Sequence, residues 1–351
     1  MDEKEKQTHL GPIIVSLANA MRAFDAPVRN PMLLSVLPSD FFWNPAQKNL
    51  TNALRLSGFS SFVVTIEHLI GALILTPILM LLRGYKHFLN LLKSFKKREL
   101  FSVGFISLGS GLGLFFFLIS FALGNPTVAI LLQKSQPLIT LLVAMLILGE
   151  RPTKFYYISA IIALIGIFFM SFEDLIAGDF FNLMAALSSL VAALFWGSNT
   201  VFGRILTDKA DYWDITVFRY IGGSIILIIF NLILFTFIPE NINALTQTFT
   251  TFPQLFPLEM IGIIAILYSA LFTGGIIPLV LYYFGLRWSK ASIGGLAELS
   301  FPLLAIFVNF VTLGYGLSVW QIFGAIILFS SVMTLSYVNA REYKRNSNKN
   351  L

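Results

Sequence analysis

The chain has 351 residues, of which 56% are hydrophobic and only 12% are charged. Soluble domains carry about 25% charged residues, so this composition excludes an ordinary soluble fold and predicts a protein of the lipid bilayer. The lack of cysteine excludes disulfide bonds, thiolate metal sites and a cysteine nucleophile.

Apolar segments of membrane-spanning length recur along the whole chain. A helix needs about 20 mostly apolar residues to cross the hydrocarbon core of a bilayer. The sequence therefore predicts an all-α membrane protein of about ten transmembrane helices. The expected spans are, in chain order, 10–29, 57–82, 100–123, 126–148, 154–172, 181–206, 213–238, 257–286, 291–313 and 318–340. The first span is interrupted by polar residues, unlike a secretory signal, so we expect it to be retained.

Lys and Arg are concentrated in alternate loops. Cytoplasmic loops of membrane proteins carry an excess of these residues. With the N-terminus inside, the inner segments include the basic link at 83–99 and the basic C-terminal tail, whereas the outer loops hold only Lys48 and Arg55. The pattern predicts a multi-pass protein of a bacterial inner membrane with both termini cytoplasmic. It also explains the net charge of +6 without nucleic acid as a partner.

Segments of the two halves of the chain align at an offset of about 165 residues. In this alignment Ser135-Gln136-Pro137-Leu138 matches Ser300-Phe301-Pro302-Leu303. We predict two five-helix repeats, residues 1–172 and 173–351, which insert in opposite directions because each has an odd number of spans. Inverted repeats of this kind place the substrate site near the midplane, at the repeat interface.

Four groups of residues carry a resemblance to a known family. They are Asn125–Ala129 followed by Gln136-Pro137 and Leu148–Arg151, then Phe195–Asn199, Gly274–Leu286 and Glu298–Pro302. In these residues the chain resembles the EamA-type ten-helix branch of the drug/metabolite transporter superfamily. The resemblance implies an inverted five-plus-five bundle and export or exchange of small metabolites or drugs. The chain departs from the pattern at Tyr315, where the first repeat has Glu150, and in its first helix.

Two charged residues inside the predicted spans approach the membrane midplane. A charge at a helix centre costs about 2.5–3.5 kcal/mol, so such groups usually pair or face water. Lys134 and Glu298 each lie roughly 12–13 Å deep, shortly before Pro137 and Pro302. Gln133 aligns with Glu298 in the repeat. We expect these polar groups to face one central substrate cavity; the alternative is a buried structural ion pair between Lys134 and Glu298.

The first span carries Arg22, Asp25 and Arg29 on one helical face. A guanidinium group matches a carboxylate or phosphate bidentately, so Arg22 and Asp25 are candidates for the substrate site. Alternatively, Asp25 only neutralises Arg22, and Arg29 extends to the interface. The slight excess of cationic groups in the spans favours a small-molecule substrate with an anionic group.

The second span carries two titratable groups, Glu67 and His68. Burial favours the neutral form of a carboxylic acid, and histidine titrates near physiological pH. Either residue could therefore carry a coupling proton, although adjacent positions point about 100° apart on a helix. A buried structural role is the alternative for His68. Arg219 is expected to extend to the membrane surface.

Trp196, Asn199 and Tyr282 are further candidates for lining the cavity, with helix packing as the alternative. The glycine-rich segment Gly109–Gly113 lies inside an apolar helix with no preceding strand. We expect it to pack against a neighbouring helix rather than bind phosphate. Thr273–Gly275 is expected to mark a bend or a close helix crossing.

Taken together, these patterns predict a secondary active transporter of a small polar metabolite or drug. It would be an exporter or exchanger that works by alternating access, with proton coupling as an option. An intramembrane lipid-modifying enzyme and a non-transporting receptor or assembly subunit stay open as alternatives. No catalytic residue, metal site or cofactor is predicted, and the sequence does not distinguish a monomer from a dimer.

Overall fold

The computed structural model describes residues 3–24, 50–123, 133–151, 154–170, 180–237 and most of 264–301, with isolated residues at 172 and between 304 and 334. Every regular element within these ranges is a helix. In chain order they are α1 (Glu3–Met21), the 3-10 turn η1 (Arg22–Phe24), α3 (Leu50–Arg83), α4 (His87–Ser94), α5 (Lys97–Leu123), α7 (Gln136–Leu148), α8 (Lys154–Met170), α10 (Phe180–Leu206), α11 (Tyr212–Phe237), the π-helical turn η5 (Ser269–Thr273), α14 (Ile276–Arg287) and α15 (Ala291–Ala297).

The helices have the length and the surface of membrane-spanning segments. In the part of the chain that the structure describes, four helical segments are long and apolar enough to cross a bilayer: Val64–Arg83, Lys97–Phe117, Tyr212–Ile233 and Ile266–Arg287. Large apolar side chains point outward from the bundle, and Leu146 on α7 is 86% exposed. Such a surface is unfavourable in water and suits hydrocarbon. A helix also satisfies its own backbone hydrogen bonds, which lipid cannot do.

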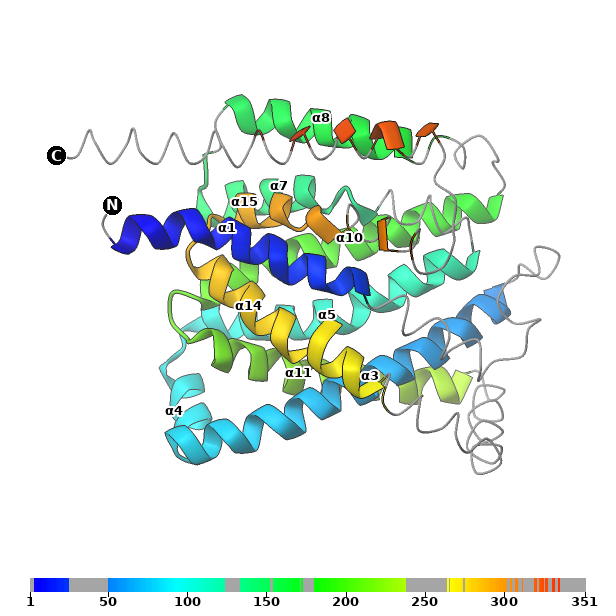
Figure 1. The fold of residues 1–351 in the computed structure, drawn as a ribbon. Helices are drawn as coiled ribbons and strands as arrows, with labels where there is room; N and C mark the ends of the chain where they lie inside the picture. The colour runs from blue at the N-terminus through cyan, green and yellow to red at the C-terminus, as the bar shows by residue number, and fades with distance from the viewer. Residues whose placement is uncertain are drawn as a thin grey trace.

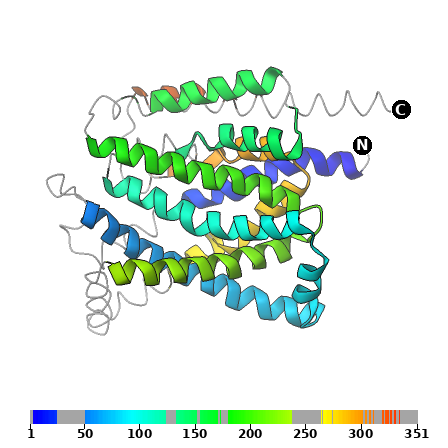
Figure 2. The same ribbon diagram turned by 180° about the vertical axis from the view of Figure 1, so that it is seen from behind.

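The long helices lie side by side as a bundle (Figure 1). Helix α5 packs against α10, α11 and α3, and α1 packs along α14. Helix α8 lies at the edge of the bundle opposite α3 and α4, in the reverse view as well (Figure 2). Helices α7 and α15, which come from different halves of the chain, are in contact.

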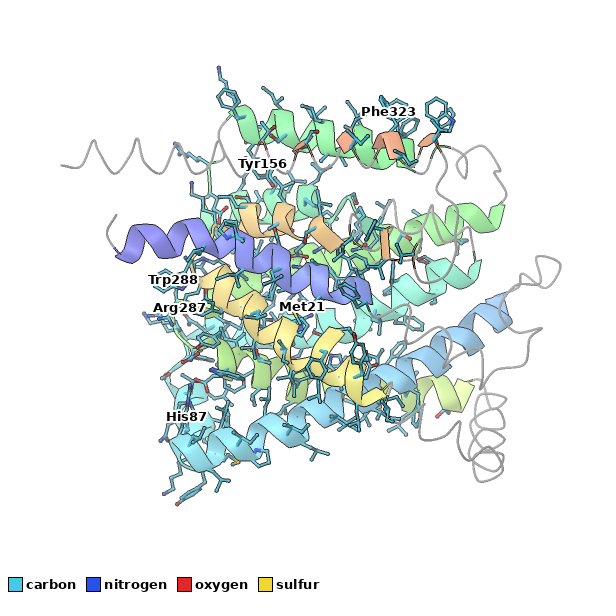
Figure 3. The ribbon with its side chains drawn as sticks, viewed as in Figure 1. Met21, His87, Tyr156, Arg287, Trp288 and Phe323 are labelled. Atoms are coloured by element: carbon cyan, nitrogen blue, oxygen red, sulfur yellow. The ribbon has the colours of Figure 1, made fainter. Side chains whose placement is uncertain are left out.

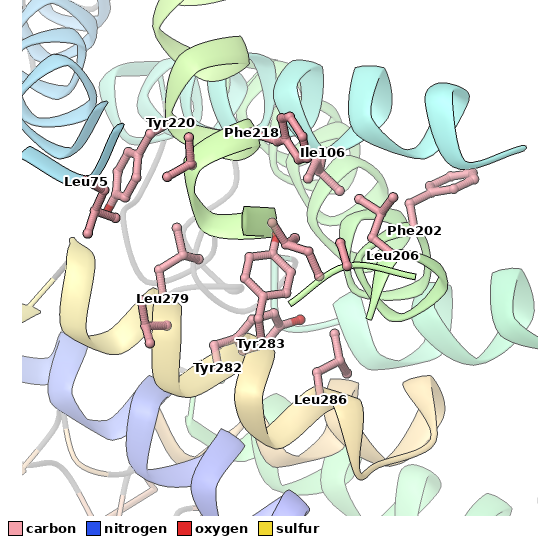
Figure 4. Close-up of a cluster of buried hydrophobic side chains, with 14 of the residues drawn as sticks. Leu75, Ile106, Phe202, Leu206, Phe218, Tyr220, Leu279, Tyr282, Tyr283 and Leu286 are labelled. Atoms are coloured by element: carbon pink, nitrogen blue, oxygen red, sulfur yellow. The ribbon is translucent and has the colours of Figure 1, made fainter. Parts of the chain in front are cut away.

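Helix α5 uses its glycines to approach α10. A Cβ atom at Gly109 would lie 2.3 Å from Asn199 Oδ1, and one at Gly113 would lie 2.6 Å from Trp196 Nε1. The expected packing role of this glycine-rich segment is therefore confirmed. The main buried cluster then joins α11 to α14 through side chains such as Tyr220 and Tyr283 (Figure 4).

One end of the bundle gathers the segments that were predicted to be cytoplasmic. Helix α1 begins at the same end of the bundle as α4 (Figure 1), and Arg287 and His87 also lie at this end (Figure 3). The link predicted at 83–99 contains α4. Asp214 at the start of α11 accepts hydrogen bonds from Arg83 at 2.8 Å and from His87 Nε2 at 3.0 Å, which ties α3 and α4 to α11. The side of the membrane that this end faces stays a prediction.

Three of the predicted spans are interrupted within the described residues. The span 126–148 breaks at Lys134–Ser135, and the span 291–313 breaks at Glu298–Leu299. Each break lies shortly before a proline in the sequence, and proline lacks the amide proton that a helix interior needs. The span 257–286 changes to a π turn before Gly275, where a Cβ atom would lie 1.6 Å from the carbonyl oxygen of Ala270. The bend predicted there is confirmed.

Other boundaries differ less from the expectation. Helix α3 begins at Leu50 rather than at 57, and α1 begins before residue 10 and gives way to a 3-10 turn at Arg22. Asp25 and Arg29 lie outside the described residues, as does most of the span predicted at 318–340. The count of ten helices and the division at residue 172 therefore stay predictions.

Candidate functional site

Glu298 lies at the break after α15 and is the centre of a hydrogen-bonded cluster. Its Oε1 accepts hydrogen bonds from Thr200 Oγ1 of α10 at 2.7 Å and from the Tyr282 hydroxyl of α14 at 2.9 Å. Its Oε2 accepts a hydrogen bond from Gln136 Nε2 at the start of α7. Gln133 Nε2 in turn donates to Gln136 Oε1 at 2.9 Å. We call these five residues the Glu298 cluster.

The two breaks in the helices place this cluster. Gln133 and Gln136 flank the turn at Lys134–Ser135, and Glu298 begins the turn that follows α15. The breaks occupy nearly equivalent positions in the predicted repeats. In a membrane, irregular backbone is tolerated where it is buried in protein or lines a water-filled cavity. The cluster therefore has the setting that transporters use for a binding site.

Lys134 is near Glu298 but does not pair with it. These two side chains form no direct ion pair, although Lys134 interacts electrostatically with both Glu298 and Arg22. The Lys134 ammonium lies over the ring of Phe301, 4.5 Å from its centroid, which is a cation–π distance. Lys134 also borders a small hollow whose other lining residues are apolar, among them Leu138 and Leu299. Glu298 is not among the residues that line this hollow.

Two arginines from different helical elements lie near the cluster. Arg22 lies in the 3-10 turn after α1, and its Nε atom is buried without a hydrogen-bond partner among the residues that the structure describes. Its electrostatic neighbours are Arg219, Glu298, Tyr282 and Tyr220. We call Arg22 and Arg219 the arginine pair.

Arg219 of α11 does not extend to the membrane surface, contrary to the expectation. Its Nη1 donates a hydrogen bond to the hydroxyl of Tyr283 at 3.3 Å. Tyr283 is fully buried, so the guanidinium group is directed into the bundle. A second cation therefore joins Arg22 beside the Glu298 cluster. Like charges at such a place repel each other, which favours an anionic or carbonyl-rich ligand between them.

Trp196 and Asn199 contact α5 and do not join the Glu298 cluster. Trp196 packs against Phe117, with ring centroids 5.2 Å apart, and Asn199 packs over Gly109. The side-chain nitrogen and oxygen of Asn199 are both buried without a hydrogen-bond partner among the described residues. Thr200, the next residue along the helix, is the one that reaches Glu298.

Glu67 and His68 lie on α3, in a layer next to the arginine pair. Glu67 is buried and interacts electrostatically with Tyr220. His68 packs edge-on against Tyr220 with ring centroids 5.5 Å apart, and its Nδ1 lies 3.0 Å from the carbonyl oxygen of Val64. Tyr220 thus stands between these two titratable groups and Arg22, with which it also interacts.

Comparison with known proteins places the chain in a family. The model of the EamA-like transporter family matches residues 50–172 and 183–337. The chain belongs to this family. It is 29% identical over 341 residues to the riboflavin transporter ImpX of Fusobacterium nucleatum, a match that covers 94% of this chain and 98% of that protein. It is also 22% identical over 207 residues to the uncharacterized transporter YoaV of Bacillus subtilis, covering 59% of this chain and 65% of that protein.

A solved crystal structure shares the fold, with a TM-score of 0.59 and 14% identity over 94% of this chain and 96% of that chain. Membership of the EamA-like family identifies a multi-pass membrane transporter rather than an enzyme. The lipid-modifying enzyme considered from the sequence is thereby set aside. A transporter of this family implies a small-molecule substrate.

Sequence reasoning missed several residues of the site. Gln136 and Thr200 bind Glu298 directly, and Tyr283 holds Arg219. A signal for Gln136 was present, because it precedes the proline in one of the family motifs. Thr200 carries no such signal, since a threonine in an apolar helix usually bonds to its own backbone.

Proposed function

We propose that the chain is a secondary transporter that binds a small polar metabolite between the Glu298 cluster and the arginine pair and moves it by alternating access. A flavin is the first candidate substrate. The proposal rests mainly on one observation: the Glu298 carboxylate is bonded to side chains from three other elements, α7, α10 and α14, at the break after α15. Any movement of one element against another would change this set of bonds.

The chemistry of the cluster suits the pyrimidine edge of a flavin. That edge has an imide N–H between two carbonyl oxygens. The carboxylate of Glu298 can accept from the N–H. The Nε of Arg22, which has no hydrogen-bond partner among the described residues, can donate to a carbonyl oxygen. Phe301, three residues after Glu298, adds an aromatic ring that lies 4.5 Å from the Lys134 ammonium. The similarity to a protein named as a riboflavin transporter supports the same choice.

The arginine pair also supports an anionic metabolite, such as a nucleotide or an organic acid. Two guanidinium groups near one buried site match a phosphate or carboxylate well. In this version Glu298 stays bonded to its three donors, and Arg22 binds the anion. The two versions differ in which substrate is transported and share the same site.

We further propose that Glu67 or His68 carries a coupling proton. Both lie one layer away from the site, on α3 beside Tyr220. A proton gained or lost by Glu67 or His68 would change the electrostatic potential at Tyr220 and Arg22. Neither residue would need to contact the substrate for this effect. The proposed orientation, with both termini in the cytoplasm of a bacterial inner membrane, places the end of the bundle that holds α4 inside.

Flux in proteoliposomes tests these proposals. Purified protein is reconstituted, and uptake and efflux of riboflavin, flavin mononucleotide, a dicarboxylate and an amino acid are measured. Glu298→Gln removes a charged acceptor, and hydrogen bonds to charged groups contribute about 1.5–3 kcal/mol each, so we expect flux of the true substrate to fall about tenfold or more. Glu99→Gln is the matched control, because Glu99 is also buried but, among the described residues, accepts a hydrogen bond only from the Lys96 amide, away from the site.

Two results would count against the proposal. If no substrate of the panel crosses the membrane with folded protein, the proposed substrate classes are wrong. If Glu298→Gln transports like the wild type, the Glu298 cluster is not the binding site, whatever the substrate.

A further inference from the structure

A line of polar side chains runs along the contact between α3 and α11. On α3 these are Ser61, Thr65 and His68, and on α11 they are Tyr220, Ser224 and Asn231. Their spacings of three, four and seven residues place each set on one helical face. We call this contact the polar seam.

The two faces of the polar seam meet directly. Asn231 Nδ2 donates a hydrogen bond to Thr65 Oγ1 at 2.8 Å, and Thr65 Oγ1 donates to the Ser61 carbonyl oxygen at 2.8 Å. Further along, the ring of His68 contacts the ring of Tyr220. The seam therefore continues from one end of the α3–α11 contact into the middle of the bundle.

Several polar atoms of the seam are buried and lack a partner. Among the described residues, these are Ser61 Oγ, Ser224 Oγ, Asn231 Oδ1 and the Tyr220 hydroxyl, and each of the four residues is at most 4% exposed. Buried side-chain polar atoms usually have a hydrogen-bond partner, either protein or ordered water. Leaving one unsatisfied costs free energy, and more so where lipid rather than water surrounds the bundle. Four in one contact between two helices call for a partner that the described residues do not supply.

Water is the partner that fits these atoms. Each atom is a hydroxyl or amide oxygen, which water can satisfy as donor, and buried waters typically bridge such groups. Along α11, Ser224 lies about 6 Å from the level of Tyr220, and Asn231 lies about 10 Å beyond Ser224. A few waters can span these steps.

We infer that the polar seam is hydrated and forms an aqueous branch that joins the Glu67–Tyr220 layer to the end of the bundle where α3 begins and α11 ends. Tyr220 lies at its inner end and interacts with Glu67, Arg219 and Arg22. The branch gives Glu67 a route to bulk water that does not pass through the Glu298 cluster. Hydration of the seam is independent of the proposed function; only its use by a coupling proton rests on that function.

The cysteine-free chain allows a direct test. Ser61→Cys and Ser224→Cys are made singly and treated in proteoliposomes with a small, water-soluble methanethiosulfonate ammonium reagent, which reacts with thiolates in water. The control is Ser120→Cys on α5. Ser120 is fully buried, but its hydroxyl donates to the Phe117 carbonyl oxygen at 2.5 Å, and it lies nearer the end of its helix than Ser61 does. The predicted spans 57–82 and 100–123 place Ser61 and Ser120 at similar depth, whereas Ser224 lies near the middle of the span 213–238. Depth alone therefore predicts similar labelling of Ser61→Cys and the control, and slower labelling of Ser224→Cys.

The inference predicts that both seam cysteines react at least about tenfold faster than the control, a difference of about 1.4 kcal/mol in barrier. Adding Asn231→Leu should slow the labelling of Ser224→Cys, because the larger apolar side chain fills the branch. Equal rates at seam and control positions, whether fast from a loosened fold or slow from a dry seam, would overturn the inference. Labelling needs no flux, so its outcome is separate from that of the transport assay.

Discussion

Glu150 joins the end of α7 to the start of α15, and its removal should destabilise the protein by a measurable amount. Its carboxylate accepts hydrogen bonds from the Ala291 amide at 2.8 Å, the Ser292 amide at 3.1 Å and the Ser292 hydroxyl at 2.5 Å. It thus caps the N-terminus of α15 from another helix. Hydrogen bonds to a charged group contribute about 1.5–3 kcal/mol each, and loss of a helix cap costs about 0.5–2 kcal/mol.

For Glu150→Ala we expect a loss of about 2 kcal/mol, below the sum of three bonds, because the partly exposed site lets water replace some of them. At about 2–4 °C per kcal/mol, Tm should fall roughly 4–8 °C. Thermal unfolding in detergent measures this. Ser292→Ala removes only the hydroxyl bond and should cost about half as much. In a protein that already carries Ser292→Ala, Glu150→Ala should lower the free energy of unfolding by less than it does in the wild type, because one of its hydrogen bonds is already lost. An unchanged Tm in Glu150→Ala, or full additivity with Ser292→Ala, would refute the capping role.

Two pairs of substitutions test the close helix packing and the buried ion pairing. Gly275→Ala places a Cβ atom 1.6 Å from the Ala270 carbonyl oxygen, so this variant should not yield folded protein. A Cβ atom at Gly104 meets nothing within 4 Å, so Gly104→Ala should be neutral or should stabilise α5 by roughly 0.5–1 kcal/mol. Comparable size-exclusion profiles for the two variants would contradict this expectation. Asp214→Asn should lower Tm more than Asp211→Asn. The Asp214 side chain is 4% exposed and pairs with both Arg83 and His87. The Asp211 side chain is 35% exposed and pairs with Arg83 but not with His87. Equal decreases in Tm would show that the buried pairing of Asp214 contributes no more to stability than the exposed pairing of Asp211.

The composition and the apolar segments determined the class of this protein. A chain with so few charges and so many spans of about 20 apolar residues has only one stable setting, the bilayer, and only helices satisfy their backbone there. The family resemblance followed from short motifs that the sequence contains. Deep charges such as Glu298 and Arg22 could be found in advance because each is costly in hydrocarbon.

Tertiary structure alone decided which polar groups meet. Thr200 and Asn199 are neighbours in sequence, yet Thr200 bonds to Glu298 and Asn199 faces α5. The rotation of α10 makes that difference, and rotation depends on packing against several helices at once. The direction of Arg219 was equally hidden, because its buried partner Tyr283 is on another helix. Breaks in helices bring Gln136 to Glu298, and a helical hydropathy pattern does not record them.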